Sequence, residues 1–88
     1  MNKIEDYLIH LQYDRRLSEN TVIAYRTDLL HFQEFLQGEG LDFLHVSRDD
    51  LTEYIIRLHE EDRLPATIRR ALSALNGFYS FLIRMDEA

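Results

Sequence analysis

The feature that most constrains the fold of this chain is a helical repeat of apolar residues, which recurs in four separate segments. Residues three and four positions apart share one face of a helix, so such a repeat predicts an amphipathic helix. In the segment LSENTVIAYRTDLLHFQEFL the repeat consists of Val22, Tyr25, Leu29, Phe32 and Leu36. No segment shows the alternation of a half-buried strand. The sequence therefore predicts an all-α fold, a compact bundle of four helices.

Residues typical of helix ends separate these segments. The expected helices are Asn2 to Tyr13, a second that starts after Ser18, a third that starts after Ser47 and a fourth that starts near Pro65. Ser18 and Ser47 are suited to the N-cap, and proline is suited to a first helical turn. Gly38 and Gly40 are expected to end the second helix. With 88 residues, residues 1–88 are expected to form one domain.

Composition restricts the location of the protein and its possible ligands. The chain has no cysteine, so it forms neither a disulfide nor a thiolate metal site. No apolar run approaches the roughly 20 residues of a membrane helix. The N-terminus MNKIEDYLIH contains acidic residues and lacks a cleavage-site pattern, so a signal peptide is not expected. These features predict a cytoplasmic protein with no membrane partner.

The charge is unevenly distributed. The formal net charge is −6, which by itself argues against a nucleic-acid partner. Residues 39–62 hold two basic and eight acidic residues, whereas residues 63–84 hold four arginines and no acid. The acidic tail adds Asp86 and Glu87. A purely basic segment in an acidic chain suggests a contact with an anionic partner; the alternative is that Arg69 and Arg70 pair with nearby acids.

Two of the predicted helices have an outer side of small or neutral residues. With about 100° per residue, the side of the second helix opposite its apolar repeat holds Asn20, Ala24, Thr27 and His31. The same projection of the fourth helix gives Ala66, Arg70, Ser73, Ala74, Gly77, Phe81 and Arg84. A helix that enters the DNA major groove needs short side chains around a few hydrogen-bonding groups. Asn20 and Thr21 occupy the first turn of the second helix, where backbone N–H groups favour phosphate.

Small residues have a second interpretation. Ala, Ser and Thr also allow close contact between helices, so the two faces could dock a partner subunit instead. Gly77 inside a helix costs about 1 kcal/mol relative to alanine, which indicates that some group approaches closely there. From the residues alone, the DNA-binding and protein-docking interpretations both remain open.

Three motifs in order resemble a known family. The first is the pattern Ser18, Thr21, Tyr25, Asp28, Leu29 and Phe32. VSRDDLTEYIIRL and LPATIRRALSALNGFYSFL follow it. Together they resemble the N-terminal core-binding, SAM-like domain of tyrosine recombinases and phage integrases, and they are most similar to the Xer type. The resemblance covers nearly all of the chain.

This resemblance implies a helical domain that forms one jaw of a clamp around duplex DNA, with its second and fourth helices at the major groove. The implied contacts are Asn20, Thr21, Ala24, Thr27, Ala66, Arg69, Arg70, Ser73 and Ala74. Arg70 is expected to reach a base edge and Arg84, near the helix end, a phosphate. The implied partners are a double-stranded DNA recombination site and, in a full-length recombinase, other protomers of a synaptic tetramer.

No catalytic residue is expected in this chain. The chemistry of the family uses a tyrosine nucleophile with basic residues around the phosphate, and these belong to a following domain. Four tyrosines fall on or beside apolar repeats and are expected in the core, namely Tyr7, Tyr25, Tyr54 and Tyr79, whereas Tyr13 lies near a turn. The four histidines lack metal-ligand spacing. No metal, cofactor or small-molecule substrate is predicted. The alternatives are a helical protein-interaction domain without DNA binding and, with no supporting residues, a small enzyme.

Overall fold

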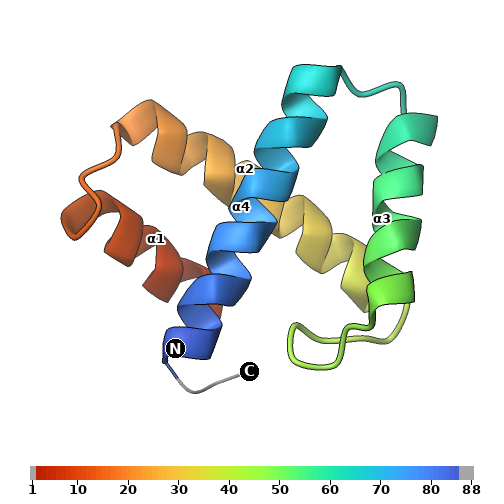
Figure 1. Cartoon of the computed structure of the whole chain (residues 1–88), viewed down its shortest axis with the longest axis horizontal. Coiled ribbons are helices and arrows are strands. Elements are labelled where there is room, and N and C mark those ends of the chain that lie inside the picture. Colours follow the sequence, from red (N-terminus) through yellow and green to blue (C-terminus); the bar gives the residue numbers. More distant parts are fainter. Residues whose placement is uncertain (1, 86–88) are drawn as a thin grey trace.

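The computed structural model describes residues 2–85, which form four helices and no strand. The helices are α1 (Lys3–Tyr13), α2 (Glu19–Gly38), α3 (Arg48–Glu60) and α4 (Pro65–Arg84). They confirm the predicted all-α fold and its order of elements (Figure 1). The predicted acidic tail, Asp86 and Glu87, lies outside the described residues.

Side-chain caps fix three of the four helix starts. Asn2 Oδ1 accepts a hydrogen bond from the N–H of Ile4 at 2.8 Å, so it caps α1 instead of forming its first turn. The Ser18 hydroxyl accepts from the N–H of Thr21 at 3.2 Å. Ser47 and Asp50 form a reciprocal capping box at the start of α3. Because each cap satisfies backbone donors that a helix leaves free, these short motifs determine the boundaries locally.

The crossing of α2 and α4 is the centre of the molecule (Figure 1). These are the two longest helices, with 20 residues each. α1 packs on one side of this crossing and α3 lies on the other (Figure 1). α4 therefore contacts all three other helices, which explains why its apolar face is the broadest in the sequence.

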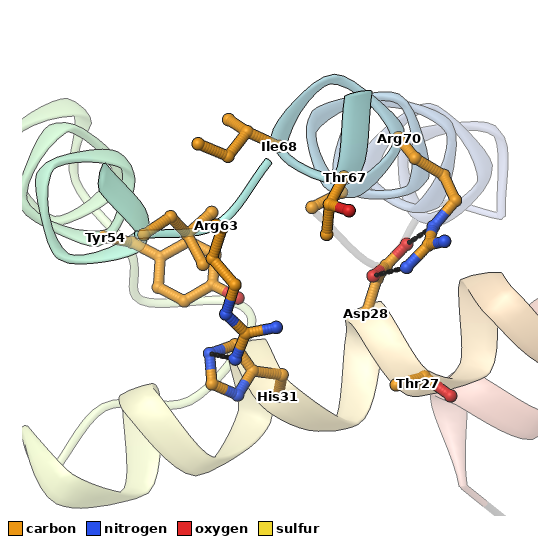
Figure 2. Close-up of a pocket in the computed structure, with 10 residues that line it drawn as sticks. Thr27, Asp28, His31, Tyr54, Arg63, Thr67, Ile68 and Arg70 are labelled. Carbon is orange, nitrogen blue, oxygen red and sulfur yellow. Dashed lines mark hydrogen bonds and ion pairs between the residues drawn. The ribbon is translucent and has the colours of Figure 1, made fainter. Parts of the chain in front are cut away.

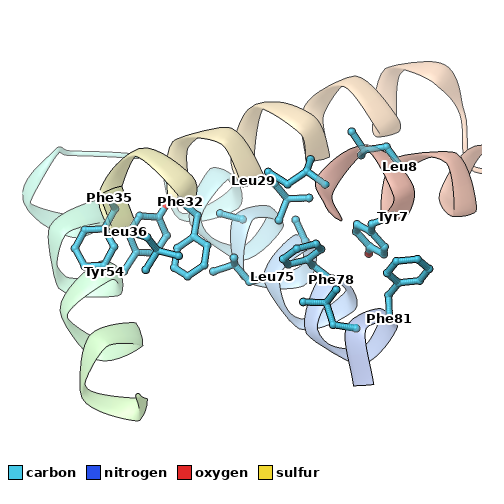
Figure 3. Packing of buried hydrophobic residues seen from close by; sticks show 14 of the residues in the cluster. Tyr7, Leu8, Leu29, Phe32, Phe35, Leu36, Tyr54, Leu75, Phe78 and Phe81 are labelled. Atoms are coloured by element: carbon cyan, nitrogen blue, oxygen red, sulfur yellow. The ribbon is translucent and has the colours of Figure 1, made fainter. Parts of the chain in front are cut away.

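Aromatic and aliphatic side chains together fill the core between the helices (Figure 3). The ring of Phe32 meets that of Tyr54 edge-on, with centroids 5.0 Å apart. Phe43, from the loop before α3, meets Phe78 in the same way at 4.9 Å. Edge-to-face contacts of this kind add to the free energy of area burial. The core thus joins α2, α3 and α4 through side chains distant in sequence.

The predicted positions of the tyrosines are largely confirmed. Tyr7 and Tyr54 are buried, and Tyr25 and Tyr79 are partly buried against the same core. The hydroxyl of Tyr79 donates to the carbonyl of Phe43 at 2.8 Å, and burial raises the pKa of this phenol to about 12. Tyr13 is exposed at the end of α1.

The predicted outer face of α4 is wrong at two positions. Ala74 has no exposed surface and Phe81 is 8% exposed. Because α1, α2 and α3 all pack on α4, its buried face is wider than the apolar repeat alone indicates. The exposed side is rotated toward Arg69, Ser73, Asn76, Ser80 and Arg84.

A contact within the chain explains the glycine at position 77. A Cβ atom built there would overlap the hydroxyl of Tyr7 and lie 3.3 Å from its Cζ atom. The close approach that a helical glycine predicts is therefore made by α1. It needs no external partner.

We expect Gly77→Ala to lower the free energy of unfolding by about 1–3 kcal/mol through overpacking, although alanine is the better helix former by about 1 kcal/mol. In the Tyr7→Phe background the overlapping oxygen is absent, so the same substitution should become neutral or stabilising. Urea unfolding of the four proteins of this double-mutant cycle measures the coupling. Equal costs in both backgrounds would contradict the contact.

Candidate nucleic-acid interface

An ion pair joins α2 and α4 where they cross (Figure 2). Arg70 donates from Nε to Asp28 Oδ2 at 2.8 Å and from Nη2 to Asp28 Oδ1 at 2.9 Å. The Asp28 side chain is 7% exposed and that of Arg70 41%. Both carboxylate oxygens are therefore matched in a bidentate geometry. Hydrogen bonding to Asp28 raises the pKa of the Arg70 guanidinium.

This pair corrects the expected setting of Arg70. The projection predicts an arginine standing free among small residues, whereas the structure commits one edge of its guanidinium to Asp28. The alternative, pairing with a nearby acid, is confirmed for Arg70. Arg69, by contrast, is exposed and has no ion pair within residues 2–85. Asp28 is absent from the predicted contacts. Its position directly beside Leu29 of the apolar repeat was the sequence signal that could have indicated a buried, paired acid.

Among the described residues, only one edge of the Arg70 guanidinium has a hydrogen-bond partner. Nη1 and the remaining N–H of Nη2 take no part in the ion pair. An arginine held in this way keeps two parallel donors with a fixed direction. The arrangement can bind a pair of acceptors more selectively than a mobile side chain can.

The other predicted contacts differ in exposure. On α2, Asn20 and Thr27 are exposed, and Thr21 and Ala24 are partly buried. On α4, the exposed members are Ala66, Arg69 and Ser73. The hydroxyl of Thr27 donates to the Ile23 carbonyl at 3.2 Å. Ala74 is fully buried, so it has no surface with which to contact a ligand.

Arg84 lies apart from these residues. Its Nη2 is 3.3 Å from Nε2 of His10, and with that residue it lines a separate hollow between α1 and the end of α4. Thr27 and Arg70, in contrast, line one pocket together. The structure thus brings α2 and the first half of α4 together, and it leaves Arg84 outside that group.

His31, at the end of the predicted outer side of α2, is held by contacts within the chain. Its Nε2 accepts from Arg63 Nη2 at 3.2 Å and lies 3.4 Å from Oε1 of Glu61. Its ring packs against Tyr54 at a centroid distance of 5.9 Å. His31 is therefore a link between α2 and the loop before α4, and its surface is only partly open.

The described residues offer no metal site and no membrane span. Across residues 2–85, no three His, Asp or Glu side chains gather in a metal-ligating arrangement. No helix in that part of the chain has the length and apolarity needed to cross a bilayer. The groups that the α2–α4 crossing presents are hydrogen-bond donors and one oriented cation.

Comparison with known proteins gives a consistent result. A family model described as phage integrase, N-terminal SAM-like domain, matches residues 4–86. The tyrosine recombinase XerC of Roseiflexus castenholzii is 42% identical over 81 residues, which cover 91% of this chain and 26% of the relative. XerC of Lacticaseibacillus casei is 38% identical over 88 residues, which cover 98% of this chain and 30% of the relative. XerD of Shewanella oneidensis is 37% identical over 84 residues, which cover 96% of this chain and 28% of the relative.

The chain therefore spans less than a third of the length of these curated relatives. No solved structure is significantly similar to it.

The ion pair predicts an asymmetric response to truncation. We expect Arg70→Ala to lower the free energy of unfolding by about 1–3 kcal/mol, because it leaves a buried carboxylate unpaired. Asp28→Ala should cost less, because Arg70 is partly exposed and water can solvate it. Denaturant unfolding of both variants and of the double variant measures the difference. A larger loss for Asp28→Ala would contradict this account of the pair.

Proposed function

Because the chain belongs to the phage integrase N-terminal SAM-like domain family, we propose that it is the DNA-binding module of a site-specific tyrosine recombinase. It forms one jaw of a clamp on duplex DNA, with α2 and α4 at the major groove. The observation that carries this proposal is the oriented guanidinium of Arg70 at the crossing of these two helices.

The free edge of Arg70 suits a base contact. Guanine presents O6 and N7 as neighbouring acceptors in the major groove, and arginine binds them with two hydrogen bonds. Asp28 holds the guanidinium in place, so less side-chain entropy is lost on binding. Thr27, Ala66 and Ser73 are exposed and short, which lets the helices approach base edges.

The revised interface omits Ala74. It consists of Asn20, Thr21, Ala24, Thr27, Ala66, Arg69, Arg70 and Ser73, with Arg84 as a more distant phosphate contact. Arg69 suits a phosphate, because it is exposed and has no ion pair within residues 2–85. The short polar residues at the start of α2 suit a phosphate as well, since backbone donors are free there.

In this proposal the module binds DNA and does not cleave it. The tyrosine nucleophile and its basic partners lie in a separate catalytic domain of the recombinase. The protein partners are then other recombinase protomers, assembled on DNA as a synaptic tetramer.

A second candidate function, a protein-interaction domain, rests on a different surface. An apolar hollow of about 280 Å³ lies between α3 and α4, lined by Leu51, Ile55, Leu72, Leu75, Asn76 and Tyr79. It is separate from the proposed DNA-binding residues of α2 and α4, most of which are polar or small. An apolar contact made there should respond little to salt.

Salt dependence distinguishes the two candidates. With the three arginines of the proposed interface, Arg69, Arg70 and Arg84, we expect the logarithm of duplex affinity to fall against the logarithm of salt with a slope of about −2 to −3. Arg69→Ala should reduce this slope by about 1. Arg48→Ala is the matched control, because Arg48 is an exposed arginine at the start of α3. A slope near zero would reject the DNA-binding proposal.

Base recognition by Arg70 is tested by Arg70→Lys, which keeps the charge and loses the two-donor fork. Selection of binding sites from random duplexes should show a guanine preference at one position for the original chain and a flattened preference for the variant. The expected loss of discrimination is about 1–3 kcal/mol at that base. If affinity falls equally for all sequences, Arg70 contacts a phosphate instead.

A further inference from the structure

A small pocket lies where α2, α3 and α4 meet, next to the Arg70–Asp28 pair (Figure 2). Its volume is about 100 Å³. Tyr54 lines it from α3, and this residue is 1% exposed. The Tyr54 hydroxyl has no hydrogen-bond partner in the part of the chain that the structure describes. Buried hydroxyls are nearly always paired, so this one points to a partner from outside the chain.

The Tyr54 hydroxyl acts as a donor in this setting. Burial raises the pKa of this phenol far above its ordinary value, and the negative charge of Asp28 raises it further. The group therefore keeps its proton across the physiological pH range. A partner that accepts a hydrogen bond is the one that satisfies it.

The Asp28 carboxylate and the His31 ring nitrogen that line the pocket already accept hydrogen bonds from arginines. Arg70 takes both carboxylate oxygens of Asp28, and Nε2 of His31 accepts from Arg63. The donors that remain among the described residues are the hydroxyls of Tyr54 and Thr67 and the N–H groups of Arg63 and Arg70 that take no part in the bonds above. A lining with an excess of donors selects a ligand rich in acceptor oxygens.

The side-chain charges at the pocket balance, since Asp28 pairs with Arg70 and Glu61 with Arg63, and the added positive potential comes from the start of α4. Two guanidinium groups and one carboxylate line the pocket. Thr67 lies in the first turn of α4, which has no side-chain cap at its start, so free backbone N–H groups and the helix dipole add positive potential. Glu61 opposes this from outside the pocket, since its Oε1 lies 3.2 Å from Nε of Arg63.

We propose that this pocket is an oxyanion site that takes a phosphate group, with the Tyr54 hydroxyl donating to one of its oxygens. The pocket has room for roughly three water molecules at about 30 Å³ each, so the ligand group is small. Two sources share this chemistry: free inorganic phosphate and a backbone phosphate of bound DNA. The DNA source rests on the proposed function, because Thr27 and Arg70 belong to both the pocket and the proposed DNA face.

The first experiment uses inorganic phosphate as the probe. The chain is titrated with phosphate at constant ionic strength, and NMR follows the Nε–H signals of Arg63 and Arg70 and the ring signals of Tyr54. We expect saturable shifts and a loss of affinity of about 10-fold or more in Tyr54→Phe, since a hydrogen bond to a charged group is lost. Shifts that do not saturate, or that are unchanged in Tyr54→Phe, would overturn the site.

Two further variants sharpen this result. Tyr79→Phe is the matched control, because it also removes a partly buried phenol hydroxyl, but one bonded to Phe43 and outside the pocket. It should leave phosphate affinity unchanged. Glu61→Gln should tighten phosphate binding several-fold, because it removes the opposing charge beside Arg63. An equal loss in both phenylalanine variants would assign the effect to the core and count against the site.

The second experiment repeats the comparison with duplex DNA. If a DNA phosphate occupies the pocket, Tyr54→Phe weakens duplex binding equally across sequences, and inorganic phosphate competes with the duplex. If Tyr54→Phe weakens only phosphate binding, the site takes free phosphate. Duplex binding without any saturable phosphate binding rejects the pocket and leaves the proposed function intact. Saturable phosphate binding without duplex binding supports the pocket and rejects the proposed function.

Discussion

Asp28 is a buried carboxylate, and the arrangement of α2 and α4 depends on its being paired. A charged group that is 7% exposed is tolerated only with a close partner. Arg70 supplies that partner from 42 residues farther along the chain. The pair therefore joins the two longest helices at their crossing. Those two helices also carry the residues proposed to contact DNA, so the ion pair and the proposed recognition surface share one arginine.

The packing of α4 against the other helices explains which of its residues are buried and which are exposed. It lies against α1, α2 and α3, which buries a wider face than a helix with one neighbour has. Gly77 lets Tyr7 of α1 approach α4 closely, and the aromatic rings of Phe78 and Phe43 close the core on the α3 side. What remains exposed on α4 is mainly arginine and small residues, together with Ile83 near its end. The proposed DNA face is thus the part of α4 that packing leaves over.

The charge pattern also has a structural explanation. The segment 63–84 has four arginines and no acid, but three of these arginines already have partners in other segments. Arg63 contacts His31 and Glu61, Arg70 contacts Asp28, and Arg84 contacts His10. The positive charge free to meet DNA is therefore smaller than the formal count indicates. Such a module is expected to bind weakly alone and to gain affinity when a second DNA-binding domain is linked to it.

The sequence by itself determined the helices, their starts and their family, because caps, apolar repeats and motif order are local properties of the chain. Ser18 and Ser47 need only neighbours three residues away, and the repeat at Leu29, Phe32 and Leu36 needs only the helical period. Only the tertiary structure decided which side of α4 is buried, since that depends on three helices packing at once and removed Ala74 from the surface. It alone paired Arg70 with Asp28 and left the Tyr54 hydroxyl without a partner among the described residues. These contacts join residues that are distant in the chain, and no local pattern specifies the distance between them.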